Sequence, residues 1–119
     1  MYIWTQLDAV RKELEIMKQI NHKNCIKTLE IIEDESGESS NKIYVIMELA
    51  NLGVVQTWDE KQFKFDANQN LKCGSFLDQK VVAKIIKDLA EGLDYLHNTA
   101  MIVHRDIKPQ NILLTQENG

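Results

Sequence analysis

The spacing of apolar residues predicts two amphipathic helices in this chain. In residues 7–21 and again in residues 79–98, apolar side chains recur about every 3.6 residues, which places them on one face of a helix. Asp8 lies near the start of the first pattern, where the helix dipole favours a carboxylate. The second pattern is the longer and more regular one, and its apolar residues are Val82, Ile85, Ile86, Leu89, Leu93 and Leu96.

Shorter apolar segments have the composition of strands. Residues 25–33 are rich in β-branched residues and predict a strand. Residues 43–49, IYVIMEL, are almost continuously apolar, which predicts a strand that is covered on both faces and buried. We expect the brief apolar runs at residues 101–103 and 112–114 to form small strands or buried extended pieces.

Polar stretches separate these elements. Residues 33–42 are acidic and rich in serine, and Gly37 indicates a turn there. Residues 54–78 show no regular period and are long for a loop inside a compact domain, which indicates an irregular insertion. We interpret its aromatic side chains as packing or disordered-loop residues rather than as a partner-binding surface. These aromatic residues are Trp58, Phe63, Phe65 and Phe76.

Composition excludes several classes of function. The 119 residues are 44% hydrophobic and 27% charged with a net charge of -4, so the chain lacks the concentrated basic face that nucleic acid requires. Cys25 and Cys73 are far apart and outside any metal-ligand spacing, which favours reduced thiols over a disulfide or a structural metal site. No apolar run has the length of a membrane span or a signal peptide. We therefore expect a soluble, cytoplasmic protein without a nucleic-acid or membrane partner.

The densest group of chemically useful side chains lies in residues 104–111, HRDIKPQN. Asp106 is a carboxylate that can accept a hydroxyl proton, and Lys108 is a cation that can neutralise a transferring phosphoryl group. Asn111 offers a neutral oxygen of the kind that Mg²⁺ accepts. Pro109 restricts the backbone between the two halves of the segment. This set matches phosphoryl transfer, which asks a protein mainly for positioning and electrostatics.

HRDIKPQN resembles the catalytic loop of eukaryotic protein kinases, H-R-D-x-K-x-x-N. The lysine after H-R-D-x is typical of the Ser/Thr-directed branch, so the resemblance implies transfer of the γ-phosphate of ATP to Ser/Thr hydroxyls of proteins, with Mg²⁺. It also implies an α+β, protein-kinase-like two-lobe fold, of which this chain would run from the αC helix to the strand after the catalytic loop. Asp106, Lys108 and Asn111 would be the catalytic residues, with Asn111 as a metal ligand.

The same resemblance assigns a nucleotide-binding role to residues in other segments. Glu13 takes the place of the αC glutamate that pairs with a strand lysine, and Met47 takes the place of the gatekeeper. The backbone carbonyl of Glu48 and the backbone amide of Ala50 would contact adenine. Leu113 would form part of the floor of the adenine pocket.

Kinase order also predicts the division of the chain. Residues 1–50 would be the rest of the N-lobe from αC to the hinge, residues 51–78 a post-hinge insertion, and residues 79–119 the start of the C-lobe. Within the family, the regions around the hinge and the catalytic loop are most similar to calcium/calmodulin-dependent protein kinase kinases. This resemblance implies a protein substrate, with another kinase as one candidate, and leaves calmodulin open as a partner. Thr28 departs from the family, which usually has a large apolar residue there.

Several kinase elements are absent from these 119 residues. No glycine-rich loop or V-A-I-K lysine precedes the first helix, and no D-F-G motif follows Asn111. We therefore expect a fragment that binds ATP poorly and is inactive alone. Two alternatives are a non-catalytic kinase-like binding module and a small-molecule phosphotransferase of kinase-like fold. The intact set Asp106, Lys108 and Asn111 argues against the first, and the presence of Arg105 with Lys108 argues against the second.

Overall fold

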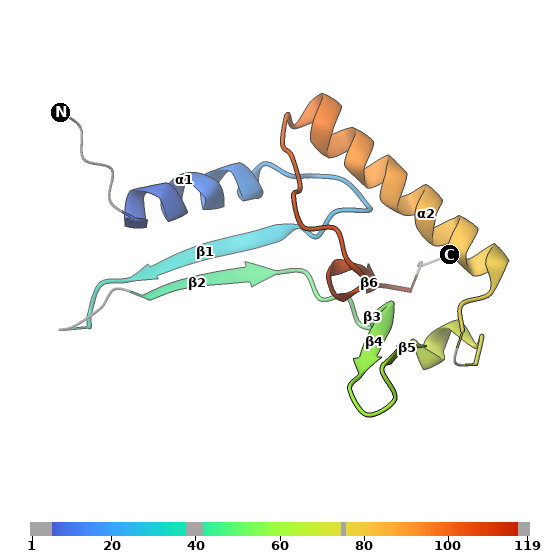
Figure 1. The fold of residues 1–119 in the computed structure, drawn as a ribbon. Coiled ribbons are helices and arrows are strands. Elements are labelled where there is room, and N and C mark those ends of the chain that lie inside the picture. Colours follow the sequence, from blue (N-terminus) through green and yellow to red (C-terminus); the bar gives the residue numbers. More distant parts are fainter. Residues whose placement is uncertain (1–5, 38–41, 75, 117–119) are drawn as a thin grey trace. The chain divides into compact units, whose positions relative to one another are not determined.

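The computed structural model describes residues 6–37, 42–74 and 76–116 (Figure 1). The chain divides into two compact units, Met1–Glu48 and Leu49–Gly119. Among the described residues, no helix is both long enough and apolar enough to cross a bilayer.

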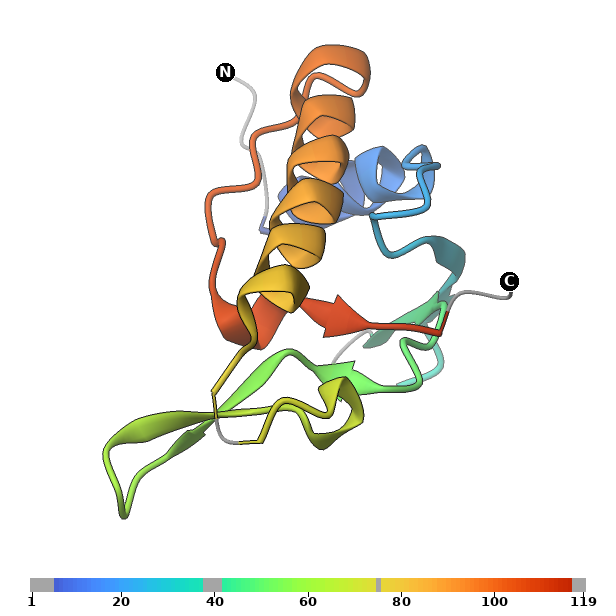
Figure 2. The ribbon, with the colours of Figure 1, turned by 90° about the vertical axis from the view of Figure 1, so that its right-hand side faces the viewer.

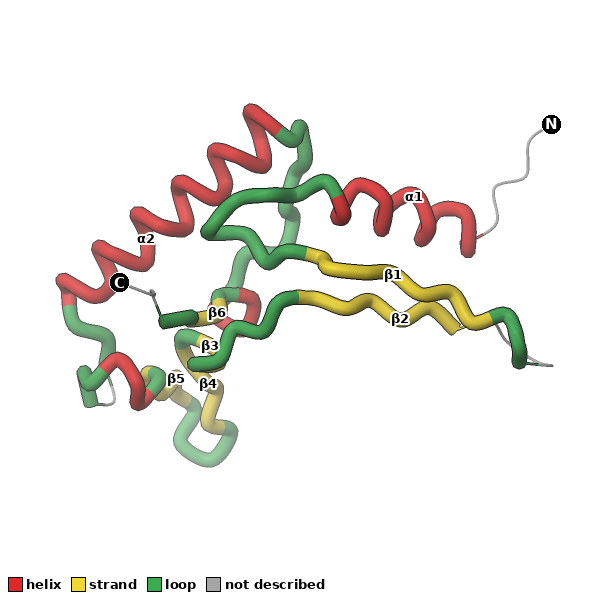
Figure 3. The backbone as a smooth tube through the Cα atoms, turned by 180° about the vertical axis from the view of Figure 1, so that it is seen from behind, coloured by secondary structure: helices red, strands yellow, loops and turns green. Residues whose placement is uncertain are grey.

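The first unit consists of helix α1 (Gln6–Lys18) and the antiparallel strands β1 (Thr28–Asp34) and β2 (Lys42–Met47). Figures 1 and 3 show the two strands side by side, with α1 along β1. Arg11 on the helix forms a two-pronged ion pair with Glu33 on β1, with N–O distances of 2.9 and 3.0 Å. Hydrogen bonding to Glu33 is also the main reason why the pKa of Arg11 is raised.

The predicted helix over residues 7–21 is confirmed but ends at Lys18. Gln19 and Ile20 donate their backbone N–H groups to residues three positions earlier, at 3.1 and 3.2 Å. Such bonds tighten the last turn and finish the α-helix. The predicted strand over residues 25–33 begins only at Thr28, because the N–H of Cys25 closes a turn onto His22.

Strand β2 confirms the predicted strand over residues 43–49, but the expectation that it is buried on both faces is wrong. Tyr44, Ile46 and Met47 are 49%, 40% and 49% exposed. The sheet formed by the described residues has only two strands, and α1 contacts β1. An apolar run therefore predicts a strand, but it does not show whether other elements cover both faces of that strand.

The second unit contains a long helix, a β-hairpin and a short strand pair that joins distant parts of the sequence. Strand β3 follows the first unit directly and pairs antiparallel with β6 near the end of the chain, while β4 and β5 form the hairpin. The elements are β3 (Gly53–Val54), β4 (Gln56–Asp59), β5 (Lys64–Ala67), η1 (Gln69–Leu71), α2 (Gln79–Asp94), η2 (Tyr95–Thr99), η3 (Pro109–Asn111) and β6 (Leu113–Leu114).

The β4–β5 hairpin corrects the prediction that residues 54–78 are irregular. It projects from the rest of its unit as a two-stranded ribbon (Figure 2). At its tip, Asp59 Oδ1 accepts from the N–H groups of Lys61 and Gln62, at 2.8 and 3.2 Å, which fixes the turn. Trp58 packs edge-on against Phe65, with ring centroids 5.1 Å apart, and against Phe63 at 6.4 Å.

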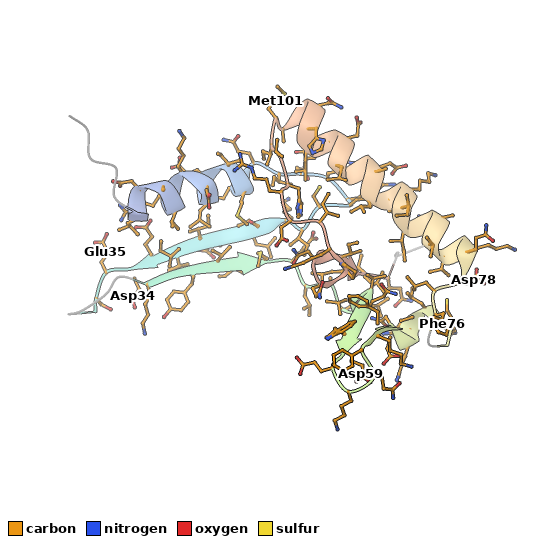
Figure 4. All side chains as sticks on the ribbon, in the orientation of Figure 1. Asp34, Glu35, Asp59, Phe76, Asp78 and Met101 are labelled. Atoms are coloured by element: carbon orange, nitrogen blue, oxygen red, sulfur yellow. The ribbon has the colours of Figure 1, made fainter. Side chains whose placement is uncertain are left out.

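Helix α2 confirms the second predicted helix. Asp78 caps its start by accepting from the N–H of Lys80 at 2.8 Å, and Figure 4 labels Asp78 at that end. Its last turn widens into the π-helical segment η2, which closes where Ala100 N–H donates to Tyr95 at 3.0 Å. Leu96 in this turn is 8% exposed and belongs to the small apolar core, together with Val55 and Ala67.

The two short apolar runs behave differently. Residues 113–114 form strand β6, as expected for the run at residues 112–114. Residues 101–103 form no strand, and Met101 and Val103 are 80% and 67% exposed, so that expectation is wrong. The N–H of Ile102, the central residue of that run, donates to the carbonyl of Leu96 at 2.7 Å. Met101 stands at the top of Figure 4, beyond the end of the helix.

The cap on α2 is testable by substitution of Asp78. Asp78→Ala removes the oxygen that accepts from Lys80 N–H, so the free energy of unfolding should fall by about 1 kcal/mol. Urea unfolding followed by far-UV circular dichroism measures this change. Asp78→Asn keeps an accepting oxygen and serves as the matched control with near-normal stability. An Asp78→Ala variant as stable as the parent would contradict the capping role.

The end of β1 makes a prediction about pH. Asp34 accepts from the Ser36 hydroxyl and from the Ser36 N–H, which lower the pKa of Asp34 in that order of importance. Because the folded pKa lies below the unfolded one, the stabilisation is present at higher pH and is lost as the pH falls through the lowered pKa. Ser36→Ala should raise the pKa of Asp34 toward about 3.9, measured by NMR titration of the carboxylate. Ser36→Thr keeps the hydroxyl, and equal pKa values in the two variants would refute the assignment.

Candidate functional site

The segment that carries the predicted catalytic residues is anchored by strand pairing after its last residue. Strand β6 pairs with β3 in the register Gly53↔Leu114 and Val54↔Leu113. The pairing is extended at both ends, because Leu52 N–H donates to Leu114 at 3.1 Å and Val55 N–H donates to Ile112 at 2.9 Å. The residues directly after Asn111 are therefore held by the segment that follows residue 51.

The structure brings together the three side chains that the sequence predicts to be catalytic. Asn111 Nδ2 donates to the backbone carbonyl of Asp106 at 2.8 Å and to its carboxylate Oδ2 at 3.0 Å. Lys108 Nζ lies 3.6 Å from the same Oδ2. One carboxylate oxygen thus contacts both an amide donor and a cation.

The backbone between these residues is closely determined. The N–H of Asp106 donates to His104 Nδ1 at 3.1 Å, so the histidine ring orients the start of the loop. Arg105 has a φ of 73°, a left-handed conformation that non-glycine residues adopt rarely and that is enriched at functional sites. Pro109 opens the single turn η3, in which Asn111 N–H donates to Lys108 at 2.9 Å.

These side chains lie at the surface. The side chains of Lys108 and Asp106 are 50% and 64% exposed, so their ion pair contributes at most about 1 kcal/mol to stability. Their arrangement is therefore better explained by chemistry than by folding energy. The Asp106 carboxylate is accessible to a hydroxyl group, Lys108 places a positive charge beside it, and Asn111 contacts Asp106 through its amide nitrogen rather than its oxygen.

The remaining predicted residues of the second unit lie along the β3–β6 pair. Leu113 is in β6 opposite Val54 and is 38% exposed. The carbonyl of Ala50 accepts from Gly53 N–H at 3.3 Å, which closes a turn just before β3. The turn fixes the backbone that follows Ala50.

The first unit carries Glu13, Met47 and Glu48. Glu48 N–H donates to the carbonyl of Lys27 at 2.9 Å, and its carboxylate accepts from the N–H of Lys27 at 2.8 Å, so both bonds join Glu48 to Lys27. Met47 ends β2 opposite Thr28, and Thr28 is 5% exposed. Glu13 is exposed on α1 beside a hollow that Ala9, Lys12 and Ile16 also line.

The sequence analysis did not identify Asn68, whose side chain is hydrogen-bonded to the β3 segment of the candidate site. Asn68, directly after β5, donates from Nδ2 to the carbonyls of Leu52 and Val54, at 2.7 Å each. Its Oδ1 accepts from Asn70 N–H at 2.9 Å, a turn that also begins η1. The turn was readable from the run Asp66–Asn70, in which asparagines alternate with other residues, but the long-range bonds were not.

Comparison with known proteins finds that the chain is similar to serine/threonine kinases. The chain is 34% identical to serine/threonine-protein kinase TOS3 of Saccharomyces cerevisiae over 110 residues. The matched region is 92% of this chain and 18% of that protein. It is 33% identical to SNF1-activating kinase 1 of the same yeast, over 91% of this chain and 9% of that protein. It is 34% identical to serine/threonine-protein kinase ssp1 of Schizosaccharomyces pombe, over 96% of this chain and 15% of that protein. The chain thus spans less than a fifth of these relatives.

The family model for the protein kinase domain matches residues 3–119, almost the whole chain. This match agrees with the α+β character of the helices and small antiparallel sheets. It includes the loop in which Asp106, Lys108 and Asn111 meet. The chain therefore belongs to the protein kinase family, with serine/threonine kinases among its relatives.

Proposed function

We propose that this chain is the part of a serine/threonine protein kinase domain that carries the catalytic loop. The observation that carries the proposal is the contact of Asp106 with both Lys108 and Asn111. A carboxylate, a cation and an amide oxygen within one exposed loop are the groups that phosphoryl transfer to a hydroxyl requires.

Asp106 and Lys108 have different tasks in this proposal. The Asp106 carboxylate accepts the proton of the substrate hydroxyl and orients its oxygen toward the γ-phosphate of ATP. Lys108, 3.6 Å away, offsets negative charge on the phosphoryl group during transfer. The bonds from Asn111 to the carbonyl and carboxylate of Asp106 keep the base from rotating away.

Asn111 also fits a place beside Mg²⁺. Its nitrogen is committed to Asp106, so its oxygen is presented as a hard, neutral ligand of the type that Mg²⁺ prefers. When bound with ATP, Mg²⁺ would neutralise phosphate charge. In this proposal Asn111 therefore both orients the base and supplies a metal ligand.

We further propose that Glu13, Met47, Glu48, Ala50 and Leu113 serve nucleotide binding. The resemblance of residues 43–53 to the hinge region of protein kinases supports this proposal, in which the backbone carbonyl of Glu48 and the backbone amide of Ala50 contact adenine. In lobe terms, residues 1–50 belong to the N-lobe, residues 51–78 form an insertion and residues 79–119 begin the C-lobe.

The substrate of the proposed kinase is a protein, with another protein kinase as the candidate class. The name of SNF1-activating kinase 1 supports this choice, as does the similarity of the hinge to calcium/calmodulin-dependent protein kinase kinases. Calmodulin is a candidate partner to be tested by binding. We propose a cytoplasmic location, which suits Cys25 and Cys73 because neither forms a disulfide within the described part of the chain. Burial raises the pKa of the Cys25 thiol.

The proposal is tested by Asp106→Asn in the protein at its full natural length. This change keeps the shape of the side chain but removes the base, so the rate of phosphoryl transfer from Mg²⁺–ATP to a Ser/Thr peptide should fall by about 10²–10⁴-fold. A radiolabelled-ATP assay measures it.

Asp88→Asn is the matched control, because Asp88 also pairs with an exposed lysine, Lys84, but lies on α2 away from the catalytic loop. It should retain the parent rate. Equal rates for Asp106→Asn and the parent would contradict the proposed role of Asp106. A parent protein that binds ATP and never transfers phosphate would instead support a non-catalytic binding module.

A further inference from the structure

Asn68 joins the β-hairpin to the segment that leads into β3, and its hydrogen-bonding capacity is almost fully used. Both donors of its amide go to backbone carbonyls, Leu52 and Val54, and its Oδ1 accepts from Asn70 N–H. Its own N–H donates to Val55 at 3.0 Å, and its carbonyl accepts from Leu71 N–H at 3.0 Å. A half-buried side chain with this many backbone partners fixes the relative position of the segments it joins.

The bonds of Asn68 depend on the shape of the backbone at Gly53. Leu52 and Val54 flank Gly53, which has a φ of +81°, a conformation that glycine adopts without strain. A Cβ atom at Gly53 would lie 3.7 Å from Asn68 Nδ2, so the amide is seated directly against this glycine. The turn at Gly53 and the amide of Asn68 therefore pack against each other.

The segment held by Asn68 is also the one that holds β6. Leu52 donates its N–H to Leu114 while its carbonyl accepts from Asn68. Val54 pairs with Leu113 while its carbonyl accepts from the same amide. Strand β6 in turn follows directly on η3, the turn that ends in Asn111. A continuous set of bonded segments therefore runs from the hairpin to the catalytic loop.

We infer that Asn68 is a positioning residue for nucleotide binding, which it supports by fixing Leu52–Val54 and, through β6, Leu113. The inference rests on the proposed kinase function, since Ala50 and Leu113 are the residues proposed to contact adenine in this unit. Asn68 does not touch the nucleotide itself. The insertion at residues 51–78 is accordingly part of the support of the binding site rather than a separate appendage.

Removing the amide has a definite physical consequence. Asn68→Ala removes the amide that donates at 2.7 Å to the carbonyls of Leu52 and Val54, and Asn68→Asp places a carboxylate that cannot donate against the same carbonyls. The β3–β6 pair should then open more often, which exposes the N–H groups that Leu52 and Val55 donate to β6. Asn70→Ala is the matched control, because the Asn70 side chain makes only a 3.4 Å bond to Leu52 and is exposed.

Two measurements on the full natural protein test the inference. Hydrogen exchange followed by NMR should show the Leu52 and Val55 amides exchanging at least about tenfold faster in Asn68→Ala than in Asn70→Ala. Isothermal titration with Mg²⁺–ATP should give a Kd about tenfold higher for Asn68→Ala, and higher again for Asn68→Asp. Amides in the middle of α2, such as that of Leu89, should exchange at the parent rate in Asn68→Ala, a local effect that general loss of structure would not produce.

The outcomes separate the two levels of the proposal. Unchanged exchange at Leu52 and Val55 would overturn the support role of Asn68. Faster exchange with an unchanged Kd for Mg²⁺–ATP would overturn its role in nucleotide binding. A parent protein that shows no binding of Mg²⁺–ATP would overturn the proposed function itself, and with it the nucleotide role of Asn68.

Discussion

The hydrogen bonds from the Asn111 amide to Asp106 are the interaction on which the candidate site depends. They link the Asn111 amide to the backbone carbonyl of Asp106 at 2.8 Å and to the Asp106 carboxylate at 3.0 Å. The first bond fixes the path of the chain, and the second fixes the direction of the Asp106 side chain. Lys108 Nζ lies 3.6 Å from the same carboxylate. Without these bonds the three groups would be ordinary polar residues on an exposed segment.

Asn111 can hold Asp106 because its own position is determined by the backbone that follows it. The turn η3 begins at Pro109, which fits the first helical position, and passes directly into β6. Strand β6 is bonded to β3, and β3 is bonded to Asn68 at the end of the hairpin. The candidate catalytic loop is thus supported by a segment more than fifty residues earlier in the chain. This arrangement explains why a small, exposed loop can have a definite geometry.

The sequence predicted the parts of this arrangement that depend on local pattern or on a compact motif. Helix α2 was predictable because its apolar face repeats over several turns, and the catalytic loop was predictable because HRDIKPQN fixes several positions at once. The hairpin around Trp58 was not predicted, since its strands are short and its turn depends on Asp59 rather than on an Asn-Gly pair. The exposure of Tyr44 was not predicted either, because a local pattern does not reveal which layers cover a strand.

The central claim, that Asp106 and Asn111 form one site for a hydroxyl and a metal ion, is tested most directly by locating the metal. Mn²⁺ in place of Mg²⁺, added with ATP to the isotope-labelled full natural protein, broadens NMR signals of nearby nuclei. The account predicts selective broadening of the Asn111 side-chain amide and the Asp106 backbone amide at substoichiometric Mn²⁺. Unbroadened signals from both residues, with selective broadening elsewhere, would contradict it.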